Sequence, residues 1–205
     1  FTIEKGVVKV LLVRRTNDPY KGKWALVGGA LYNNEELEDG IKREIFEKTG
    51  MVGIDVSMYQ AFGKVKRSPI QRMVALGYIG LIDANKVNVL KETLKTSDAD
   101  WFPLDKIPEL AYDHAEILSA AIAELKKRII ESDILKSLYP NGFTMPEIQK
   151  VYETVLDKKI DKRNFRKKFL SLGLIEDTNK YVTFAGTKPA KLYKFKKNKK
   201  NKSVL

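Results

Sequence analysis

The sequence of 205 residues contains no cysteine and a single histidine, His114. The absence of cysteine excludes disulfides and thiolate metal sites, and it favours a protein of the reducing cytoplasm. A Ser-His catalytic pair would have to use His114, because no second histidine exists. No run of about 18 apolar residues is present, so we expect no membrane-spanning helix. No signal-peptide pattern is visible either, although the chain begins at Phe1 rather than at a methionine.

Charge is distributed unevenly along the chain. Residues 158–202 contain 16 Lys or Arg against three acidic residues, a balance of +13. The remaining residues contain 22 basic and 23 acidic side chains, although the whole chain carries a formal net charge of +12. A uniformly basic protein can simply be soluble, but a basic segment at one end favours nucleic acid or an anionic surface as a partner.

The first two thirds of the chain alternate strand-like and helix-like segments. The expected strands are 7–13, 22–29, 54–62 and 74–82, and the expected helices are 35–49 and 113–129. In the first helix Leu37, Ile41 and Ile45 recur at helical spacing, and Gly50 is a stop signal. Asp113 is positioned to cap the second helix. The turn signals near residue 140 place a domain boundary after residue 130, which gives domains 1–130 and 131–196 and a basic, disordered tail 197–205.

The residues around the first helix follow a fixed spacing, G-x5-E-x7-R-E-U-x-E-E-x-G-U, where U is a bulky aliphatic residue. The positions that match are Gly29, Glu35, Arg43, Glu44, Ile45, Glu47, Gly50 and Met51. Lys48 stands where the pattern has its last glutamate. This pattern resembles the Nudix box, and agreement at so many fixed spacings is improbable by chance.

The resemblance assigns chemistry to one face of this helix. Glu44, Glu47 and position 48 lie three or four residues apart and therefore share a helix surface. In an intact Nudix hydrolase that surface is a carboxylate cluster that holds Mg²⁺ against a diphosphate. Glu44 and Glu47 are the candidate metal ligands and, with Arg43, the candidate catalytic residues. Arg43 can hold Glu47 in place one turn further on, and Gly28 and Gly29 allow a tight turn before the helix.

Lys48 changes the charge of this surface by two units, because a carboxylate is lost and an ammonium is gained. It lies four residues after Glu44, the spacing of an internal salt bridge. Mg²⁺ binding depends on charge and on rigid oxygen geometry, so we expect weak Mg²⁺ binding or none, and no required cofactor. Val27 stands where intact enzymes usually have proline, a departure in the same direction, but Arg43, Glu44 and Glu47 survive and leave hydrolysis open.

Other residues of the first domain are less specific. Arg67 and Arg72 follow a strand and can grip phosphate or ribose hydroxyls, or they simply belong to an exposed basic loop. Trp24 and Trp101 are expected in the core rather than as stacking platforms. A downstream catalytic carboxylate is not identified, and the loop candidates are Glu92, Asp98 and Asp100.

The basic end begins with a strong helix start. Thr144 and Glu147 form a capping box, Phe143 and Ile148 form a hydrophobic staple, and Pro146 falls in the first turn. A second helix capped by Asp161 buries Phe165, Phe169 and Leu172 and ends at Gly173, and two strands are expected to pair around a turn at 185–189. Helix, turn, basic helix and hairpin together predict a winged helix whose second helix enters the major groove of DNA.

The cationic residues of this domain are the candidate DNA contacts. Arg163 and Arg166 are expected at base edges, whereas the lysines are better suited to phosphates, where a point charge suffices. The full set of candidates is Lys162, Arg163, Arg166, Lys167, Lys168, Lys188 and Lys191.

With both halves in place, the chain resembles the Nudix-related transcriptional regulators over essentially its full length. The stretches that carry the resemblance are 23–29, the box, 110–114, 143–149, 161–166 and 188–193. The resemblance implies an α+β protein, with a Nudix α/β/α sandwich containing a mixed sheet and a small C-terminal winged helix. It further implies a homodimeric repressor of metabolic genes, whose hold on operator DNA changes when an ADP-ribose-like nucleotide or a pentose such as arabinose binds. The first strand of the Nudix sheet is expected upstream of Phe1. The implied ligand-binding residues are Arg67, Arg72, Asp113, His114 and Gly29.

Two alternatives remain at this level. The first is an active, Mg²⁺-dependent ADP-ribose pyrophosphatase in which the winged helix is secondary; Lys48 and the basic segment argue against it. The second makes the basic domain a docking module for RNA or protein, which a steep salt dependence of binding to palindromic duplex DNA would exclude.

Overall fold

The computed structural model describes residues 1–131, 134–183 and 188–196. By its internal contacts the chain forms two compact units, Phe1–Ala123 and Glu124–Leu205. This division lies inside helix α2 (His114–Ile130), a few residues before the domain boundary expected after residue 130. Among the described residues, no helix has both the length and the apolar character needed to span a bilayer.

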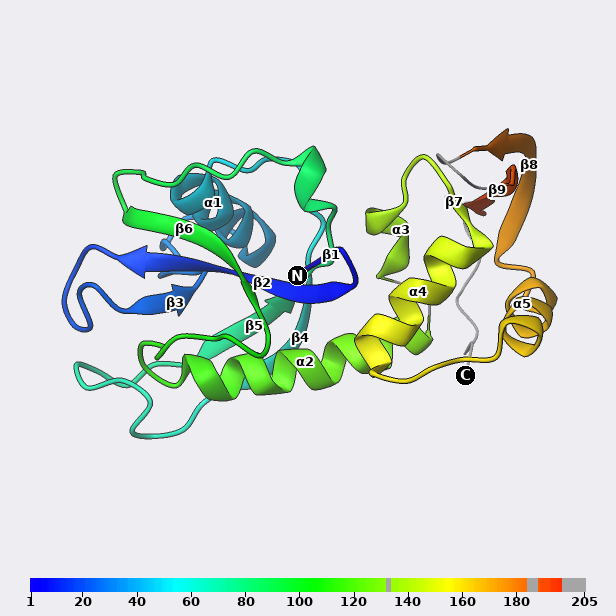
Figure 1. Cartoon of the computed structure of the whole chain (residues 1–205). Coiled ribbons are helices and arrows are strands. Elements are labelled where there is room, and N and C mark those ends of the chain that lie inside the picture. The colour runs from blue at the N-terminus through cyan, green and yellow to red at the C-terminus, as the bar shows by residue number, and fades with distance from the viewer. Residues whose placement is uncertain (132–133, 184–187, 197–205) are drawn as a thin grey trace. The chain divides into compact units, whose positions relative to one another are not determined.

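The first unit is built on a four-stranded sheet (Figure 1). Its strands are β1 (Thr2–Glu4), β2 (Val7–Arg15), β3 (Trp24–Leu26) and β6 (Thr96–Pro103). The other three strands all pair with β2, each antiparallel, and a parallel bridge joins Trp24 to Leu110. A separate antiparallel pair is formed by β4 (Ser57–Phe62) and β5 (Ala75–Ile79), followed by the short 3₁₀ helix η1 (Ala84–Lys86).

Two helices cover opposite faces of the four-stranded sheet (Figure 1). Because side chains alternate along a strand, Val10 and Leu12 of β2 face Leu118 of α2, whereas Leu11 faces Ile45 of α1 (Leu37–Thr49). Trp24 packs in the first of these clusters and Trp101 in the second, as expected for core residues. The predicted α/β/α sandwich is therefore confirmed.

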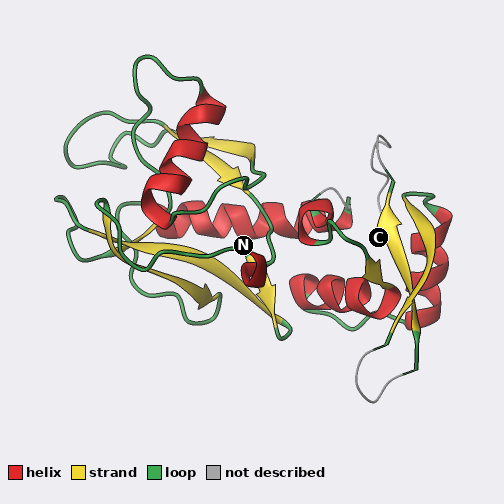
Figure 2. Ribbon diagram, turned by 90° about the horizontal axis from the view of Figure 1, so that it is seen from above, coloured by secondary structure: helices red, strands yellow, loops and turns green. Residues whose placement is uncertain are grey.

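The second unit has the arrangement of a winged helix (Figure 2). Its elements are α3 (Leu135–Leu138), β7 (Phe143–Thr144), α4 (Met145–Leu156), α5 (Lys162–Ser171), β8 (Ile175–Val182) and β9 (Ala190–Phe195). The three strands form an antiparallel sheet in the order β7-β9-β8. Phe143, Tyr152, Phe165 and Phe169 form the aromatic core, with several ring pairs in edge-to-face contact.

Local signals set the ends of helices α4 and α5. Thr144 accepts a hydrogen bond from the Glu147 amide, and the Glu147 carboxylate accepts one from the Thr144 amide, which confirms the capping box. The Asp161 carboxylate accepts a hydrogen bond of 2.8 Å from the Asn164 amide and caps α5. The expected turn at 185–189 lies mostly, and the tail 197–205 wholly, outside the described residues.

Candidate functional site

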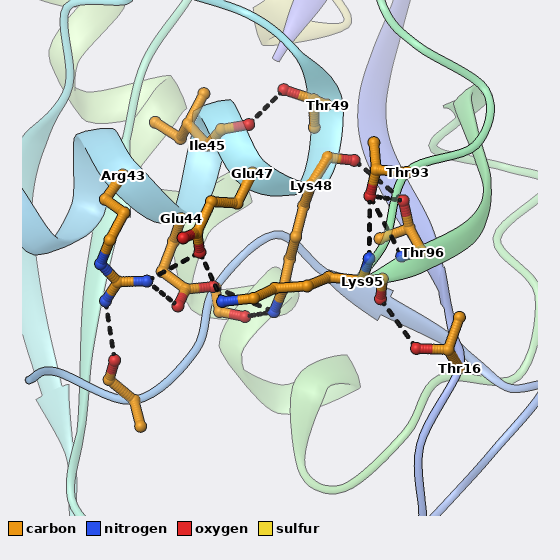
Figure 3. Close-up of polar contacts among 12 residues, drawn as sticks. Thr16, Arg43, Glu44, Ile45, Glu47, Lys48, Thr49, Thr93, Lys95 and Thr96 are labelled. Carbon is orange, nitrogen blue, oxygen red and sulfur yellow. Dashed lines mark hydrogen bonds and ion pairs between the residues drawn. The ribbon is translucent and has the colours of Figure 1, made fainter.

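Charged side chains gather on one side of α1, where Arg43 contacts Glu44 and Glu47 (Figure 3). Arg43 also binds a third carboxylate, that of Glu35. Its Nη1 donates to Glu44 Oε1 at 2.5 Å and to Glu47 Oε2 at 2.9 Å. Its Nε donates to Glu35 Oε2 at 2.8 Å, and its guanidinium lies over the ring of Tyr32 at 3.8 Å. The predicted pairing of Arg43 with Glu47 is confirmed, and Glu35 at the start of the box belongs to the same network.

The network keeps two of its carboxylates, Glu35 and Glu47, ionised. The hydrogen bonds from Arg43 lower the pKa of Glu35 to about 2. The pKa of Glu47 is lowered by the ammonium of Lys95 first and by Arg43 second. Conversely, the pKa values of Arg43 and Lys95 are raised, chiefly by Glu35 and Glu47 respectively. At neutral pH these side chains are therefore all charged, and their charges are satisfied within the protein.

Lys48 lies at the buried side of this network. Its Nζ donates a hydrogen bond to the backbone carbonyl of Gly28 and lies 3.1 Å from Glu44 Oε2. The side chain of Glu44 is only 7% exposed, and among the described residues Oε2 has no well-aligned hydrogen-bond donor. A buried carboxylate needs compensating charge, and Glu44 has two cationic partners, Arg43 at Oε1 and Lys48 at Oε2. The predicted salt bridge between Lys48 and Glu44 is confirmed.

The oxygen donors of this face do not fit a magnesium ion as they stand. Mg²⁺ requires several oxygen ligands in near-octahedral geometry. Here Glu44 is engaged by Arg43 and Lys48, and Glu47 by Arg43 and Lys95. Within the described ranges no three His, Cys, Asp or Glu side chains are arranged to hold a metal ion. None of the three candidate downstream carboxylates lines the pocket beside Glu44; they are Glu92, Asp98 and Asp100.

A pocket of about 250 Å³ opens beside Lys48. Three cationic side chains line it, Arg15 at the end of β2, Lys48 on α1 and Lys95 just before β6, against the single carboxylate of Glu44. Its other lining residues are Val13, Thr16, Asn17, Ala25, Leu26, Gly28, Thr96 and His114. The ionised groups of the pocket therefore favour an anionic ligand.

His114 is the one predicted ligand-binding histidine, and it lines this pocket. Burial lowers its pKa to about 4, so the imidazole is neutral at pH 7. Its Nδ1 accepts a hydrogen bond of 3.0 Å from the Leu26 amide, which places the proton on Nε2. His114 is thus a fixed hydrogen-bond donor at the pocket wall.

The remaining predicted ligand-binding residues have structural partners. Arg67 is buried and binds both oxygens of Asp113 at 2.9 Å, so this carboxylate anchors a loop to the start of α2 instead of standing free as a helix cap. Arg72 donates to the backbone carbonyls of Lys64 and Met73. None of these three side chains lines the pocket.

Gly29 has a steric role next to the network. A Cβ at this position would lie 2.3 Å from the Cδ of Glu44, a distance that real Cβ atoms do not show. The loop can therefore pass over the carboxylate only because residue 29 has no side chain. Neighbouring Gly28 has open space at the corresponding position.

Arg15 and Lys95 are pocket residues that the sequence did not single out. They reach the pocket from segments about 30 and 50 positions away from Lys48, and no short-range spacing connects them to the box. Arg15 follows the expected strand 7–13, whereas the sequence offered no signal for Lys95, because the strand Thr96–Pro103 was not predicted.

The cationic side chains of α5 form a second candidate site. They lie opposite Phe165 and Phe169, which are buried, and all are exposed; they are Lys162, Arg163, Arg166, Lys167 and Lys168. Arg166 Nη2 is 3.5 Å from the hydroxyl of Tyr193, at the limit of a hydrogen bond. Lys188 is exposed, whereas Lys191 is paired with Asp177 at 2.5 Å, which raises the pKa of Lys191.

Comparisons with known proteins match both units. The NUDIX domain family model matches residues 3–121, and the model of the NrtR DNA-binding winged helix domain matches residues 135–195.

Individual relatives agree with these matches. The ADPR responsive transcriptional repressor NtrR of Acinetobacter baylyi is 31% identical over 95% of this chain and 78% of its own length. The crystal structure of Shewanella oneidensis NrtR superposes with a TM-score of 0.81 at 30% identity, covering 96% of this chain and 90% of that one. Structures of that protein with a 27mer DNA, and of its NUDIX domain with ADP ribose, match with TM-scores of 0.76 and 0.54. An ADP-ribose pyrophosphatase of Methanocaldococcus jannaschii is 32% identical over 54% of this chain and 63% of its own length.

Proposed function

Since this chain belongs to the NUDIX family and carries an NrtR DNA-binding winged helix domain, we propose that it is a transcriptional repressor that releases operator DNA in response to ADP-ribose. The Acinetobacter relative, named as an ADPR responsive repressor, aligns with both units of the chain rather than with one. We also propose that the protein is a homodimer, that its operator is palindromic and that the genes it represses are metabolic.

The observation that carries the proposal is the contrast between the two charged helices. The cations of α5 are exposed and face solvent, which suits a phosphate backbone. The cations of α1 are paired with carboxylates, so the site lacks the free carboxylates of a hydrolase. The pocket beside it still has more cationic than acidic side chains, which suits an anion. We therefore expect binding without efficient turnover.

The charge of the pocket discriminates between the two classes of effector. Arg15, Lys48 and Lys95 outnumber the carboxylate of Glu44. A diphosphate gains from this excess of positive charge, whereas arabinose is uncharged and gains nothing from it. ADP-ribose is therefore the expected effector, with its diphosphate at this cationic edge and the Nε2–H of His114 as an additional donor.

Fluorescence anisotropy with a duplex from the protein's own promoter region tests this function. The titration is repeated with ADP-ribose and with arabinose at several salt concentrations, while hydrolysis of ADP-ribose is followed with Mg²⁺. Tight, salt-sensitive binding that ADP-ribose weakens and arabinose does not is the expected result. Binding that neither ligand changes would contradict the proposal.

A second candidate function is an ADP-ribose pyrophosphatase. It is favoured by the survival of Arg43, Glu44 and Glu47 and by the Methanocaldococcus relative, which aligns with 54% of this chain. Rapid hydrolysis of ADP-ribose by the full chain, with weak DNA binding, would support this function over the repressor.

A further inference from the structure

Lys48 stands at the position where an intact Nudix box has a glutamate, whose carboxylate can bind a cation. The ammonium of Lys48 is held between a carbonyl oxygen, that of Gly28, and a carboxylate oxygen, that of Glu44 (Figure 3). Carbonyl and carboxylate oxygens are the ligands that hard divalent cations take in proteins. The side chain of Lys48 is 15% exposed, so its ammonium is fixed by these two contacts and is not free to leave for solvent.

This ammonium retains binding capacity toward the pocket. An ammonium has three N–H donors, and the described contacts of Lys48 Nζ involve Gly28 and Glu44. Lys48 also lines the pocket of about 250 Å³. A ligand oxygen in that pocket can therefore accept the remaining N–H.

Lys95 and Arg15 extend the cationic edge. Lys95 Nζ bonds to Glu47 and lies 3.4 Å from the hydroxyl of Tyr32, while the Lys95 carbonyl accepts a hydrogen bond from Thr16. The guanidinium of Arg15 is fixed by the carbonyls of Pro19 and Asn17 and lies over the ring of Tyr112. Both cations are thus positioned before a ligand arrives, which reduces the entropy lost on binding.

The charges of the pocket match a particular anion. The three cations of the pocket exceed Glu44 and Glu47, the partner of Lys95, by one positive charge. A diphosphate diester carries one negative charge on each phosphoryl group, so the side chains alone offset part of its charge. Added Mg²⁺ would have to displace Lys48 from Glu44 and Gly28 before it could contribute.

We propose that Lys48 acts as a built-in counter-cation, so that the pocket binds a diphosphate-linked nucleotide through Lys48, Lys95 and Arg15 without a divalent metal ion. The inference deepens the proposed function and depends on it for the identity of the ligand. An ammonium neutralises phosphate oxygens but offers no coordination position for an attacking water. A lysine in place of the glutamate at position 48 therefore allows the diphosphate to bind without being hydrolysed.

Isothermal titration of the full chain with ADP-ribose, in Mg²⁺ and in EDTA, tests the inference. The expected dissociation constants agree within about twofold in the two buffers, because no metal ion takes part. Lys48→Met should weaken binding in EDTA by about tenfold, the scale of one lost charge-assisted hydrogen bond, while Lys48→Arg retains most of it. Lys42→Met, on the exposed face of the same helix, is the matched control and should bind normally.

Lys48→Met removes one of the two cationic partners of the buried carboxylate of Glu44 and leaves Arg43, so folding is checked by thermal denaturation. The double variant Lys48→Met/Glu44→Gln removes both charges and keeps the test valid if the single variant unfolds. It should still bind ADP-ribose more weakly than the unaltered protein in EDTA. Unaltered affinity in folded Lys48→Met or in the double variant would overturn the inference.

Inorganic pyrophosphate, as a second probe, separates this inference from the proposed function. If ADP-ribose binds only with Mg²⁺ and still releases DNA, the repressor function is supported and the role of Lys48 as a counter-cation is contradicted. If ADP-ribose does not bind, but pyrophosphate binds in EDTA and its binding requires Lys48, the role of Lys48 is supported and ADP-ribose is excluded as the effector. Binding of neither probe in EDTA contradicts the inference.

Discussion

Two helices of this protein are rich in charge, and they use it in opposite ways. On α1 the cation Arg43 and the carboxylates Glu44 and Glu47 lie on one surface, and their partners include Lys48 and Lys95. On α5 the basic residues alternate with a buried aromatic stripe, and no acidic residue lies between Lys162 and Ser171. Similar residue types therefore build an internally neutralised site in one unit and an outward cationic face in the other.

The difference lies in burial as much as in composition. Arg43 and Lys48 have side chains that are 18% and 15% exposed, and a charge at such depth requires a fixed partner. The basic side chains of α5 are exposed, where water satisfies them until a polyanion displaces it. We therefore expect a small ligand to bind where charge is already organised, and DNA to bind where exposed charge can meet many phosphates.

The largest expected effect is the loss of DNA binding when exposed cationic side chains of α5 are removed. Replacing Arg163 and Arg166 by Ala should weaken operator binding by about 100-fold or more, since each well-placed base contact is worth about 1–3 kcal/mol. Anisotropy titrations measure the change. The matched control is Lys126→Ala/Lys127→Ala, which removes the same charge from exposed positions on α2 and should cost much less. Equal losses in the two double variants would mean that α5 is not the recognition helix.

The second effect is a pH dependence that belongs to the first unit. His114 has its pKa lowered from 6.5 to about 4 by burial, so the unfolded chain takes up a proton at this residue before the folded one does. The stability is complete above pH 6.5 and falls as the pH drops toward 4, by an amount on the order of 3 kcal/mol. Urea denaturation at pH 7.5 and pH 4.5 measures the loss.

His114→Gln provides the control for this pH dependence. Glutamine does not titrate, so the variant should lose less stability between the two pH values than the unaltered protein. An unchanged dependence in the variant would assign the effect to other groups. The pKa of Glu35 is lowered to about 2, so its contribution is retained above its unfolded value near 4.5 and is lost only at lower pH.

The third effect tests the close packing of the neutralised network. Gly29→Ala would place a Cβ 2.3 Å from the Cδ of Glu44, and the displacement of that carboxylate should cost about 1–3 kcal/mol. Gly28→Ala meets no atom within 4 Å and is the matched control. Thermal melting of the two variants compares them, and an equal melting temperature would show that the loop adjusts without strain.

The smallest expected effect is a loss of stability when the N-terminal cap of α5 is removed. Asp161→Ala removes the side chain that accepts from the Asn164 amide, which should cost about 1 kcal/mol of stability, whereas Asp161→Asn keeps most of the cap. Chemical denaturation monitored through the second unit measures both variants. An equal loss for Asp161→Asn and Asp161→Ala would indicate that charge rather than capping is what matters at this position.

The sequence was sufficient for most of the fold because its signals were local. The spacing from Gly29 to Met51 predicted α1 and its charge pairs, and Thr144 with Glu147 predicted the start of α4. The strand Thr96–Pro103 was missed, since its polar sequence carries little strand character and it exists through pairing with β2.

The site was only partly predictable for a related reason. His114 was singled out and lines the pocket, but Arg15 and Lys95 contribute through contacts between distant segments. Arg67 and Asp113 are expected at the ligand; the structure pairs them with each other, and neither lines the pocket beside Lys48. Residue type indicates that an arginine seeks an anion, but only the folded chain determines whether that anion is a ligand or a neighbouring carboxylate.

The most direct test of the account is the response of DNA binding to ADP-ribose in EDTA. Duplex from the protein's own promoter region is titrated with the full chain, ADP-ribose is added, and the nucleotide is then recovered and examined by chromatography. The account predicts that DNA is released without a divalent metal ion and that ADP-ribose is recovered intact, including after incubation with Mg²⁺. Binding that ignores ADP-ribose, together with its rapid cleavage in Mg²⁺, would contradict a sensor built around the ammonium of Lys48.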